Sequence, residues 1–308
     1  MKYLQNKIAE SRFSLPVTIV AAVALWMLTG LREEMHWLLL VFLLAGTYLM
    51  AELNNQNALM RTYSRMVSCS FVVFDLIMAP VFHDYVVGVV QLCAILCWLF
   101  LFKAYQNKRA QGYVFFAFCM LSMASLLEVG VLWFVPVLWI LLGTCIMAMS
   151  MRNFLASLLG LFVPYWFVMG YDVYSGAMPR MVSHLTQLIA FSPVADLGAM
   201  SELTLITLVF FVVLTLIGTV HFLRFSYNDK IRTRMLFEIF ITMSLIIVVL
   251  LIVQPHSYSI LTALLIVNMS PLVAHTITFT RSRLSNIMFA LFSVCGLVLL
   301  FCNLLWQP

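Results

Sequence analysis

Residues 152–171 read RNFLASLLGLFVPYWFVMGY, an apolar run that is interrupted by Gly160 and Pro164. A helix that crosses a membrane needs about 20 predominantly apolar residues, and this run supplies them. It leads into residues 172–201, the longest connection in the chain, which keeps polar side chains among apolar ones. Since the other connections are only a few residues long, we expect a substrate or partner to bind at this segment.

The composition places nearly the whole chain inside a membrane. Hydrophobic residues make up 64% of the 308 positions and charged residues only 9%, whereas roughly a quarter of the residues of a soluble domain are charged. The apolar runs leave no room for a soluble domain. We therefore predict an all-α, polytopic transmembrane helical bundle that forms a single domain over residues 1–308.

About eleven membrane helices are predicted from the apolar runs. Of the 17 Lys and Arg residues, all except Arg32 and Arg180 then fall on the side of the N-terminus. The positive-inside rule therefore predicts a cytoplasmic N-terminus, an outer C-terminus and an outward connection 172–201. The predicted helices are 17–31, 37–53, 65–82, 85–102, 113–127, 130–149, 153–171, 202–223, 236–253, 258–279 and 285–306.

The outward connection contains a predicted amphipathic helix over residues 178–193. Arg180 and His184 lie off its apolar face, so they are candidate contacts for the phosphate of a substrate. Such a helix lies flat at the outer interface, either as a substrate gate or as a lid that covers the bundle. Its apolar residues recur at helical spacing and are Met181, Leu185, Leu188 and Ile189.

Asp75 lies within an apolar run, and an ionisable group in the hydrocarbon region normally faces the interior of the bundle. With a helix rise of about 1.5 Å per residue, Asp75, Gln91 and Asn268 reach depths of about 10–15 Å below the outer surface. Gly160 reaches the same level, and Pro164 leaves its carbonyl without a donor. These groups predict a substrate-binding polar cavity; interhelical hydrogen bonding that only fixes the packing is the alternative.

Glu33, Glu34 and Asp172 are the candidate catalytic carboxylates, because each lies on the predicted outer side and would act there as a base or metal ligand. The spacing of the acidic and histidine residues matches no recognised metal motif, so metal and cofactor stay open. The formal net charge of +5 follows from the topology, and nucleic-acid binding has no support.

Two stretches carry a resemblance: Leu53-Asn54-Asn55 through Arg61, Tyr63 and Ser64 to Arg65, and Arg152-Asn153-Phe154 through Leu158-Leu159-Gly160 to Pro164-Tyr165-Trp166. They resemble a family of bacterial polytopic inner-membrane proteins of unknown function, over roughly residues 40–175. This resemblance implies multi-pass insertion in the bacterial inner membrane and supplies no activity. In architecture the chain is also similar to many-helix glycosyltransferases that use polyprenyl-phosphate sugars at the outer face, although its first outer loop is much shorter.

Three functions are compatible with these features. The first is action at the outer leaflet in envelope lipid or glycan metabolism, with membrane lipids and a polyprenyl-phosphate-linked substrate as partners. The second is a transporter or flippase that uses the level of Asp75, Gln91 and Asn268. The third is a non-catalytic subunit whose outer loop docks a protein partner. Bound lipid on a single purified species would favour the first two functions, and a stoichiometric protein that co-purifies with the chain would favour the third.

Overall fold

The structure is a computed structural model that describes residues 4–28, 34–82, 84–176, 178–188, 201–254, 257–280 and 282–306. Within these ranges the chain is helical and contains no strand. The elements are α1 (Leu4–Glu10), α2 (Ser14–Leu28), α3 (Glu34–Asn57), α4 (Met66–Met78), η1 (Ala79–Val81), α5 (Tyr85–Lys103), α6 (Gln111–Leu127), η2 (Val129–Trp133), α7 (Phe134–Thr144), α8 (Met151–Ser175), α9 (Met178–Thr186), α10 (Glu202–Phe225), η4 (Ser226–Asn228), α11 (Ile231–Val253), α12 (Tyr258–Phe279) and α13 (Arg283–Trp306).

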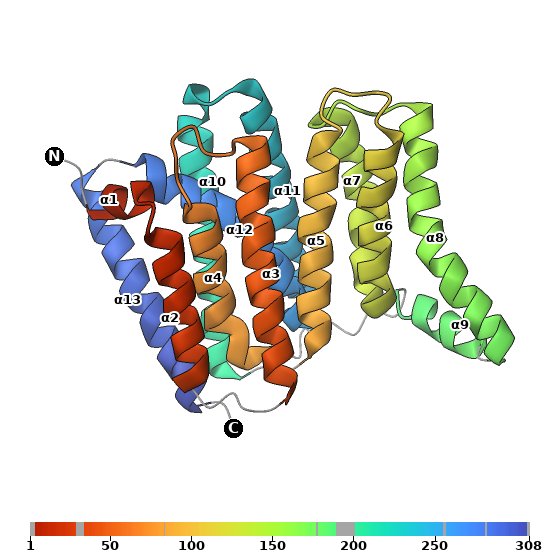
Figure 1. The fold of residues 1–308 in the computed structure, drawn as a ribbon, viewed down its shortest axis with the longest axis horizontal. Coiled ribbons are helices and arrows are strands. Elements are labelled where there is room, and N and C mark those ends of the chain that lie inside the picture. Colours follow the sequence, from red (N-terminus) through yellow and green to blue (C-terminus); the bar gives the residue numbers. More distant parts are fainter. Residues whose placement is uncertain are drawn as a thin grey trace.

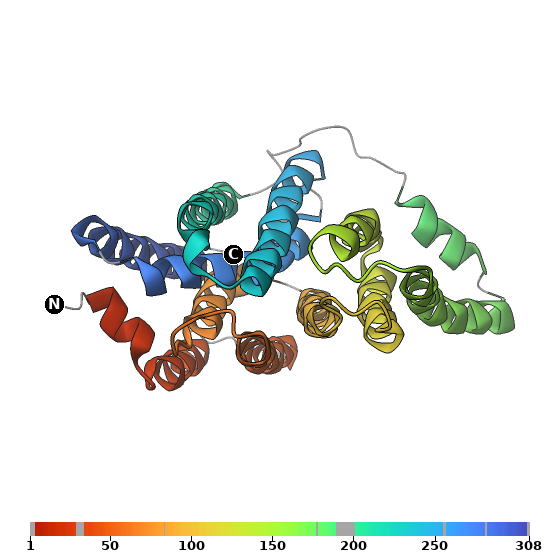
Figure 2. The same ribbon diagram turned by 90° about the horizontal axis from the view of Figure 1, so that it is seen from above.

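The helices stand side by side, and most run between the same two ends of the molecule (Figure 1). The short helix α1 lies at the upper end in this view, whereas α13 finishes at the lower end. Seen from above, the bundle is elongated, with α13 and α2 at one edge and α8 and α9 at the other (Figure 2). The all-α prediction is confirmed, and a short N-terminal helix, α1, is added to it.

Seven of the described helices are long and apolar enough to cross a membrane: α3, α5, α8, α10, α11, α12 and α13. Shorter apolar helices occupy 14–27, 66–81, 111–127 and 129–144. Each of these segments overlaps a helix predicted from the sequence. The match follows from the low polarity of the runs, because a backbone in lipid must satisfy its own hydrogen bonds.

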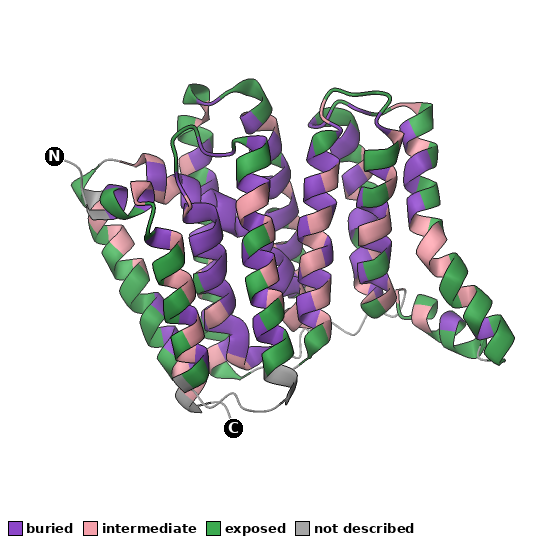
Figure 3. Cartoon of the chain, in the orientation of Figure 1, coloured by how far each residue is buried: buried purple, intermediate pink, exposed green. Residues whose placement is uncertain are grey.

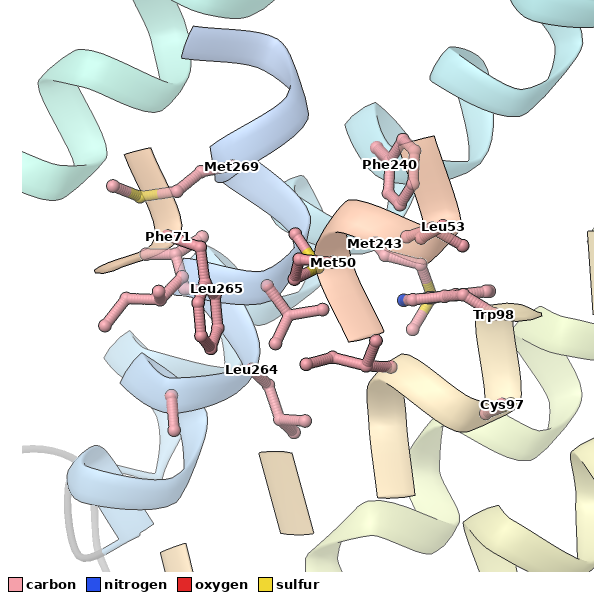
Figure 4. Packing of buried hydrophobic residues seen from close by; sticks show 14 of the residues in the cluster. Met50, Leu53, Phe71, Cys97, Trp98, Phe240, Met243, Leu264, Leu265 and Met269 are labelled. Carbon is pink, nitrogen blue, oxygen red and sulfur yellow. The ribbon is translucent and has the colours of Figure 1, made fainter. Parts of the chain in front are cut away.

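Helix α12 is the centre of the bundle and α8 is at its periphery. In their most apolar windows, 83% of the α12 positions are buried, against 22% of those in α8. Helix α12 packs against α4, α5, α10 and α11, and the burial is correspondingly concentrated there (Figure 3). The core around it joins side chains of α3, α4, α5, α11 and α12 (Figure 4), among them Met50, Phe71, Trp98, Phe240 and Leu265.

Hydroxyl and glycine residues set the ends of the helices that flank the long connection. Ser150 accepts a hydrogen bond from the Asn153 amide at 3.2 Å and caps α8, and Ser201 does the same for α10. Gly176 ends α8 with a φ of 72°, a left-handed conformation that glycine adopts without strain.

The predicted amphipathic helix exists as α9, but it ends at Thr186 rather than near residue 193. It packs against α8 at the lower end of the molecule in Figure 1. Met181 is buried as predicted, whereas Leu185 is 42% exposed. Ile189 and Pro193 lie outside the described residues.

Candidate functional site

A large cavity lies at the end of the bundle that carries α1. It has a volume of about 1010 Å³ and is walled by α1, α2, α4, α10, α12 and α13. Its lining comes from the first halves of α2 and α13, from residues 66–74 of α4 and from the second halves of α10 and α12, which meet at this end (Figure 1). Small-molecule pockets occupy roughly 300–1,000 Å³, so the cavity accommodates a large ligand.

The polarity of the lining changes along the helix axes. The hydroxyl, amide and basic lining residues gather near the helix ends beside α1, which we call the mouth, together with Ile8, Phe13 and Phe225. The lining farther along the helices, which we call the deeper wall, is mainly apolar. Among the described residues that line it, Arg224 is the one with a permanent charge and none is a carboxylic acid. The mouth includes Gln5, Ser11, His221, Arg224, Thr280, Ser282 and Ser285, and the deeper wall includes Val73, Phe74, Leu214, Phe289 and Phe292.

Helix α1 is fastened beside this mouth by two amide side chains. Gln5 Nε2 donates to the carbonyl oxygens of Ile277 at 3.2 Å and Thr280 at 2.7 Å. Asn6 Nδ2 donates to those of Thr278 at 3.3 Å and Thr280 at 3.1 Å. The last carbonyls of a helix have no partner within it, so these amides satisfy the end of α12 and hold α1 in place.

A buried histidine and a carboxylate lie next to the cavity. His275 of α12 is fully buried, and its Nε2 is 3.0 Å from Oδ2 of Asp229, which lies between η4 and α11. The other oxygen of Asp229 is 3.5 Å from Nε of Arg61. The guanidinium of Arg61 also lies 4.2 Å from the centroid of the Phe279 ring, a cation–π contact.

His221 of α10 connects this pair with the cavity. Its ring lines the cavity, and the centroid is 5.5 Å from that of the His275 ring. Its Nε2 is 2.9 Å from Oγ1 of Thr280, another lining residue. Aromatic rings enclose His275 with centroid distances of 5.1, 5.3 and 4.7 Å, those of Phe222, Phe237 and Phe279.

Asp75 and Gln91 meet in the interior, as the sequence predicted. Gln91 Nε2 donates to Asp75 Oδ1 at 2.8 Å and to the Ala263 carbonyl of α12 at 3.4 Å. Asp75 is only 6% exposed and Gln91 only 3%. The cavity beside them measures about 10 Å³, about the room of one water molecule. The pair therefore acts here as a link between helices α4, α5 and α12.

The other two features of the predicted polar level lie elsewhere. Asn268 Nδ2 donates to the Leu264 carbonyl of its own helix at 2.7 Å, and Asn268 lines a different cavity of about 30 Å³. Gly160 faces α6, where an added Cβ would collide with the carbonyl oxygen of Phe115. Among the described residues, Asp75 and Gln91 thus share one contact, Asn268 and Gly160 lie elsewhere, and the four features form no common polar cavity.

The predicted outer site is held by contacts within the protein. His184 Nε2 of α9 lies 2.9 Å from the Ser125 carbonyl, and the Ser125 hydroxyl lies 2.9 Å from that of Tyr165. Asp172 is 2% exposed, and its Oδ2 has no hydrogen-bond partner among the described residues. Arg180 is exposed. Glu33 and the side chain of Glu34 lie outside the described residues.

Sequence reasoning missed the groups beside the large cavity. Arg61 is one of the Lys and Arg residues on the predicted cytoplasmic side, and nothing in the sequence pairs it with Asp229 or His275. His221 was overlooked, although an imidazole inside an apolar run is a signal of the same kind as Asp75. The rotation of each helix, which the sequence does not specify, brings these four side chains together.

Comparison of the chain with protein-family models, curated proteins and solved structures finds no match. The resemblance of residues 40–175 to an uncharacterised inner-membrane family therefore stays a prediction. Within the described part of the chain, no three His, Cys, Asp or Glu side chains are arranged to hold a metal ion.

Proposed function

We propose that this protein binds a lipid-like amphiphile with an anionic headgroup, in the membrane leaflet on the side of its N-terminus. The observation that carries the proposal is the graded lining of the 1010 Å³ cavity. An acyl chain fits the apolar depth, where burial of each CH₂ contributes about 0.8 kcal/mol. A phosphate or another anion fits the mouth, where Arg224, His221 and several hydroxyls provide hydrogen-bond donors.

Further positive charge at the same end supports an anionic headgroup. Arg12 and Arg283 are exposed, and they adjoin the lining residues Ser11 and Ser282 in the chain. Exposed cations near a membrane surface attract anionic lipids by roughly 1 kcal/mol each. These arginines therefore favour delivery of an anionic ligand to the mouth.

We further propose that the chain crosses the membrane about eleven times, with its N-terminus in the cytoplasm of a bacterium and its C-terminus outside. The alternating direction of the long and short apolar helices and the clustering of Lys and Arg support this topology. The ligand would then come from the cytoplasmic leaflet. A cysteine placed at Lys108 should react with a membrane-impermeant reagent from the cytoplasmic side only, and one at Ser175 from the outer side only. The reverse pattern would contradict the topology.

The glycosyltransferase-like alternative at the outer leaflet depends on groups that the structure supports less well. Asp172 is buried and His184 is bound to the Ser125 carbonyl, so neither is poised toward a phosphate in this conformation. The transporter alternative is supported by the buried Asp75 and Gln91 pair, although the space beside that pair is small. The peripheral, largely unburied α8 suits either lipid contact or a protein partner.

Binding is tested with the purified protein in phosphatidylcholine nanodiscs and with 1-oleoyl lysophosphatidylglycerol, which has one chain and one negative charge. Calorimetric titration, corrected with empty nanodiscs, should show saturable binding that is weaker for zwitterionic 1-oleoyl lysophosphatidylcholine. Arg224→Gln should lower the affinity for the anionic probe by about three- to tenfold, the equivalent of about 0.7–1.4 kcal/mol. Arg109→Gln is the control, because Arg109 is exposed on the connection between α5 and α6, away from the cavity.

The volume of the cavity provides a second, independent test. Val73→Trp places an indole in the cavity and should abolish saturable binding. Val213→Trp is its matched control, because Val213 does not line the cavity and the two valines are 42% and 41% exposed. Equal binding by both variants, or no saturable binding by the wild type, would refute the proposed function.

A further inference from the structure

The imidazole of His275 carries its hydrogen on Nε2. A carboxylate oxygen only accepts hydrogen bonds, so the 3.0 Å contact with Asp229 requires a donor at Nε2. A neutral imidazole has one donor and one acceptor nitrogen. Nδ1 of neutral His275 is therefore an acceptor, directed away from Asp229.

The same reasoning assigns the hydrogen of His221. The hydroxyl of Thr280 donates to the Thr276 carbonyl at 2.6 Å, so its oxygen accepts from His221 Nε2 at 2.9 Å. Nδ1 of neutral His221 is then also an acceptor. In both imidazoles, therefore, Nε2 donates to an oxygen and Nδ1 is an acceptor.

Both acceptor nitrogens are enclosed and lack a donor. Nδ1 of His221 and Nδ1 of His275 are buried, and neither has a hydrogen-bond partner among the described residues. The two rings lie 5.5 Å apart, centroid to centroid. Buried acceptors without donors destabilise a protein, and one added proton would convert one of these nitrogens into a donor.

Charges of both signs lie around the pair. Asp229 faces His275 from the connection between η4 and α11, and Arg61 faces Asp229 from the connection between α3 and α4. Arg224 lies three residues beyond His221 on α10 and lines the mouth. The other described ring contacts of the pair are with phenylalanines. Asp229 is therefore the carboxylate that offsets a positive charge on His275, and Arg61 is the cation that opposes it.

We propose that His221 and His275 together form a binding site for one proton, which is occupied when an anionic headgroup enters the mouth of the cavity. The inference rests on the proposed function and adds proton coupling to it. A hydronium ion in the water on the N-terminal side supplies the proton, so that one O–H bond breaks, one N–H bond forms and a water molecule is left. A proton on Nδ1 of His221 places positive charge at the cavity wall beside Thr280. A proton on Nδ1 of His275 gives an imidazolium whose charge is offset by Asp229 at Nε2.

Calorimetry in buffers of different ionisation enthalpy tests this coupling. The probe is 1-oleoyl lysophosphatidylglycerol, whose phosphodiester keeps one negative charge throughout the interval from about pH 5 to 8, in which imidazoles titrate. Wild-type protein should take up close to one proton per bound probe. Where the pair titrates, its affinity should rise up to tenfold for each unit by which the pH is lowered.

His221→Gln and His275→Gln each keep a donor where Nε2 lies and remove the titratable ring. Each variant should still bind the probe, with proton uptake reduced to near zero and a flat pH profile. His184→Gln, on α9 at the far end, is the control and should behave as wild type. Thermal melting shows which variants are folded, and ¹⁵N chemical shifts of the wild-type imidazoles, with and without the probe, report protonation without any substitution.

The outcomes separate the two proposals. Binding without proton uptake, a pH-independent affinity or unchanged imidazole shifts would overturn the proton site and leave the proposed function intact. Full proton uptake by both glutamine variants would overturn it as well. A wild-type protein that does not bind the probe would overturn both proposals.

Discussion

The hydrogen bond between the buried residues Asp75 and Gln91 allows a quantitative test of how the helices are held together. Gln91→Leu removes the donor that lies 2.8 Å from Asp75 and leaves a buried polar group without this partner. Such a loss costs about 1–3 kcal/mol in free energy of unfolding. Asp75→Leu should cost less, because Gln91 keeps its second acceptor, the Ala263 carbonyl at 3.4 Å.

The double variant should be more stable than the sum of the single effects predicts. Interhelical hydrogen bonds in membranes give coupling energies of about 0.6 kcal/mol on average and up to about 1.7 kcal/mol. The pair is 6% and 3% exposed and its bond is short, so we expect a coupling near the upper part of this range, about 1–1.7 kcal/mol.

The assay is reversible unfolding of the purified protein in mixed micelles with increasing mole fractions of dodecyl sulfate. A cycle that combines Asp75→Leu with Ser293→Ala is the control, because the Ser293 hydroxyl donates to the Phe289 carbonyl of its own helix. That cycle should show no coupling. Additivity of Asp75→Leu and Gln91→Leu within about 0.3 kcal/mol would refute the claim that their hydrogen bond stabilises the bundle.

Two further predictions concern α8 and α9. Gly160→Ala should destabilise the protein by about 1–3 kcal/mol in the same assay, because its Cβ meets the backbone of α6. A Cβ added at Gly170 meets no atom within 4 Å, so Gly170→Ala should stabilise α8 by up to about 1 kcal/mol. Equal effects of the two glycine substitutions would contradict the close packing of α6 and α8. His184→Ala should accelerate hydrogen exchange in α9 by removing its contact with Ser125, whereas Arg180→Ala should change stability by no more than about 0.5 kcal/mol. Unchanged exchange in the His184 variant would show that this contact does not hold α9.

Several features of the fold follow from local sequence alone. The positions of the membrane helices could be predicted because long apolar runs in lipid must become helices. The cap at Ser201 and the buried amphipathic position Met181 follow from spacing along a single helix. Contact between Asp75 and Gln91 was also predictable, because a short connection places both at the same depth on successive helices.

Other features depend on which helices become neighbours and how each is rotated. Helices α4 and α5 follow one another in the chain, yet each packs more closely against α3 and α12 than against the other. The large cavity lies between α2, α4, α10, α12 and α13, and hydropathy does not encode how far apart these helices pack.

The acid–imidazole group beside the cavity is the clearest case of a site that only the tertiary structure reveals. Asp229 and His275 are 46 residues apart, and Arg61 comes from a third part of the chain. In the sequence these residues resemble the ordinary polar residues found near helix ends. The packing of α10 and α11 on α12 brings these residues together. The apolar side chains of the helices determine how each helix is rotated, and the buried polar groups must then pair with the partners that this rotation places beside them.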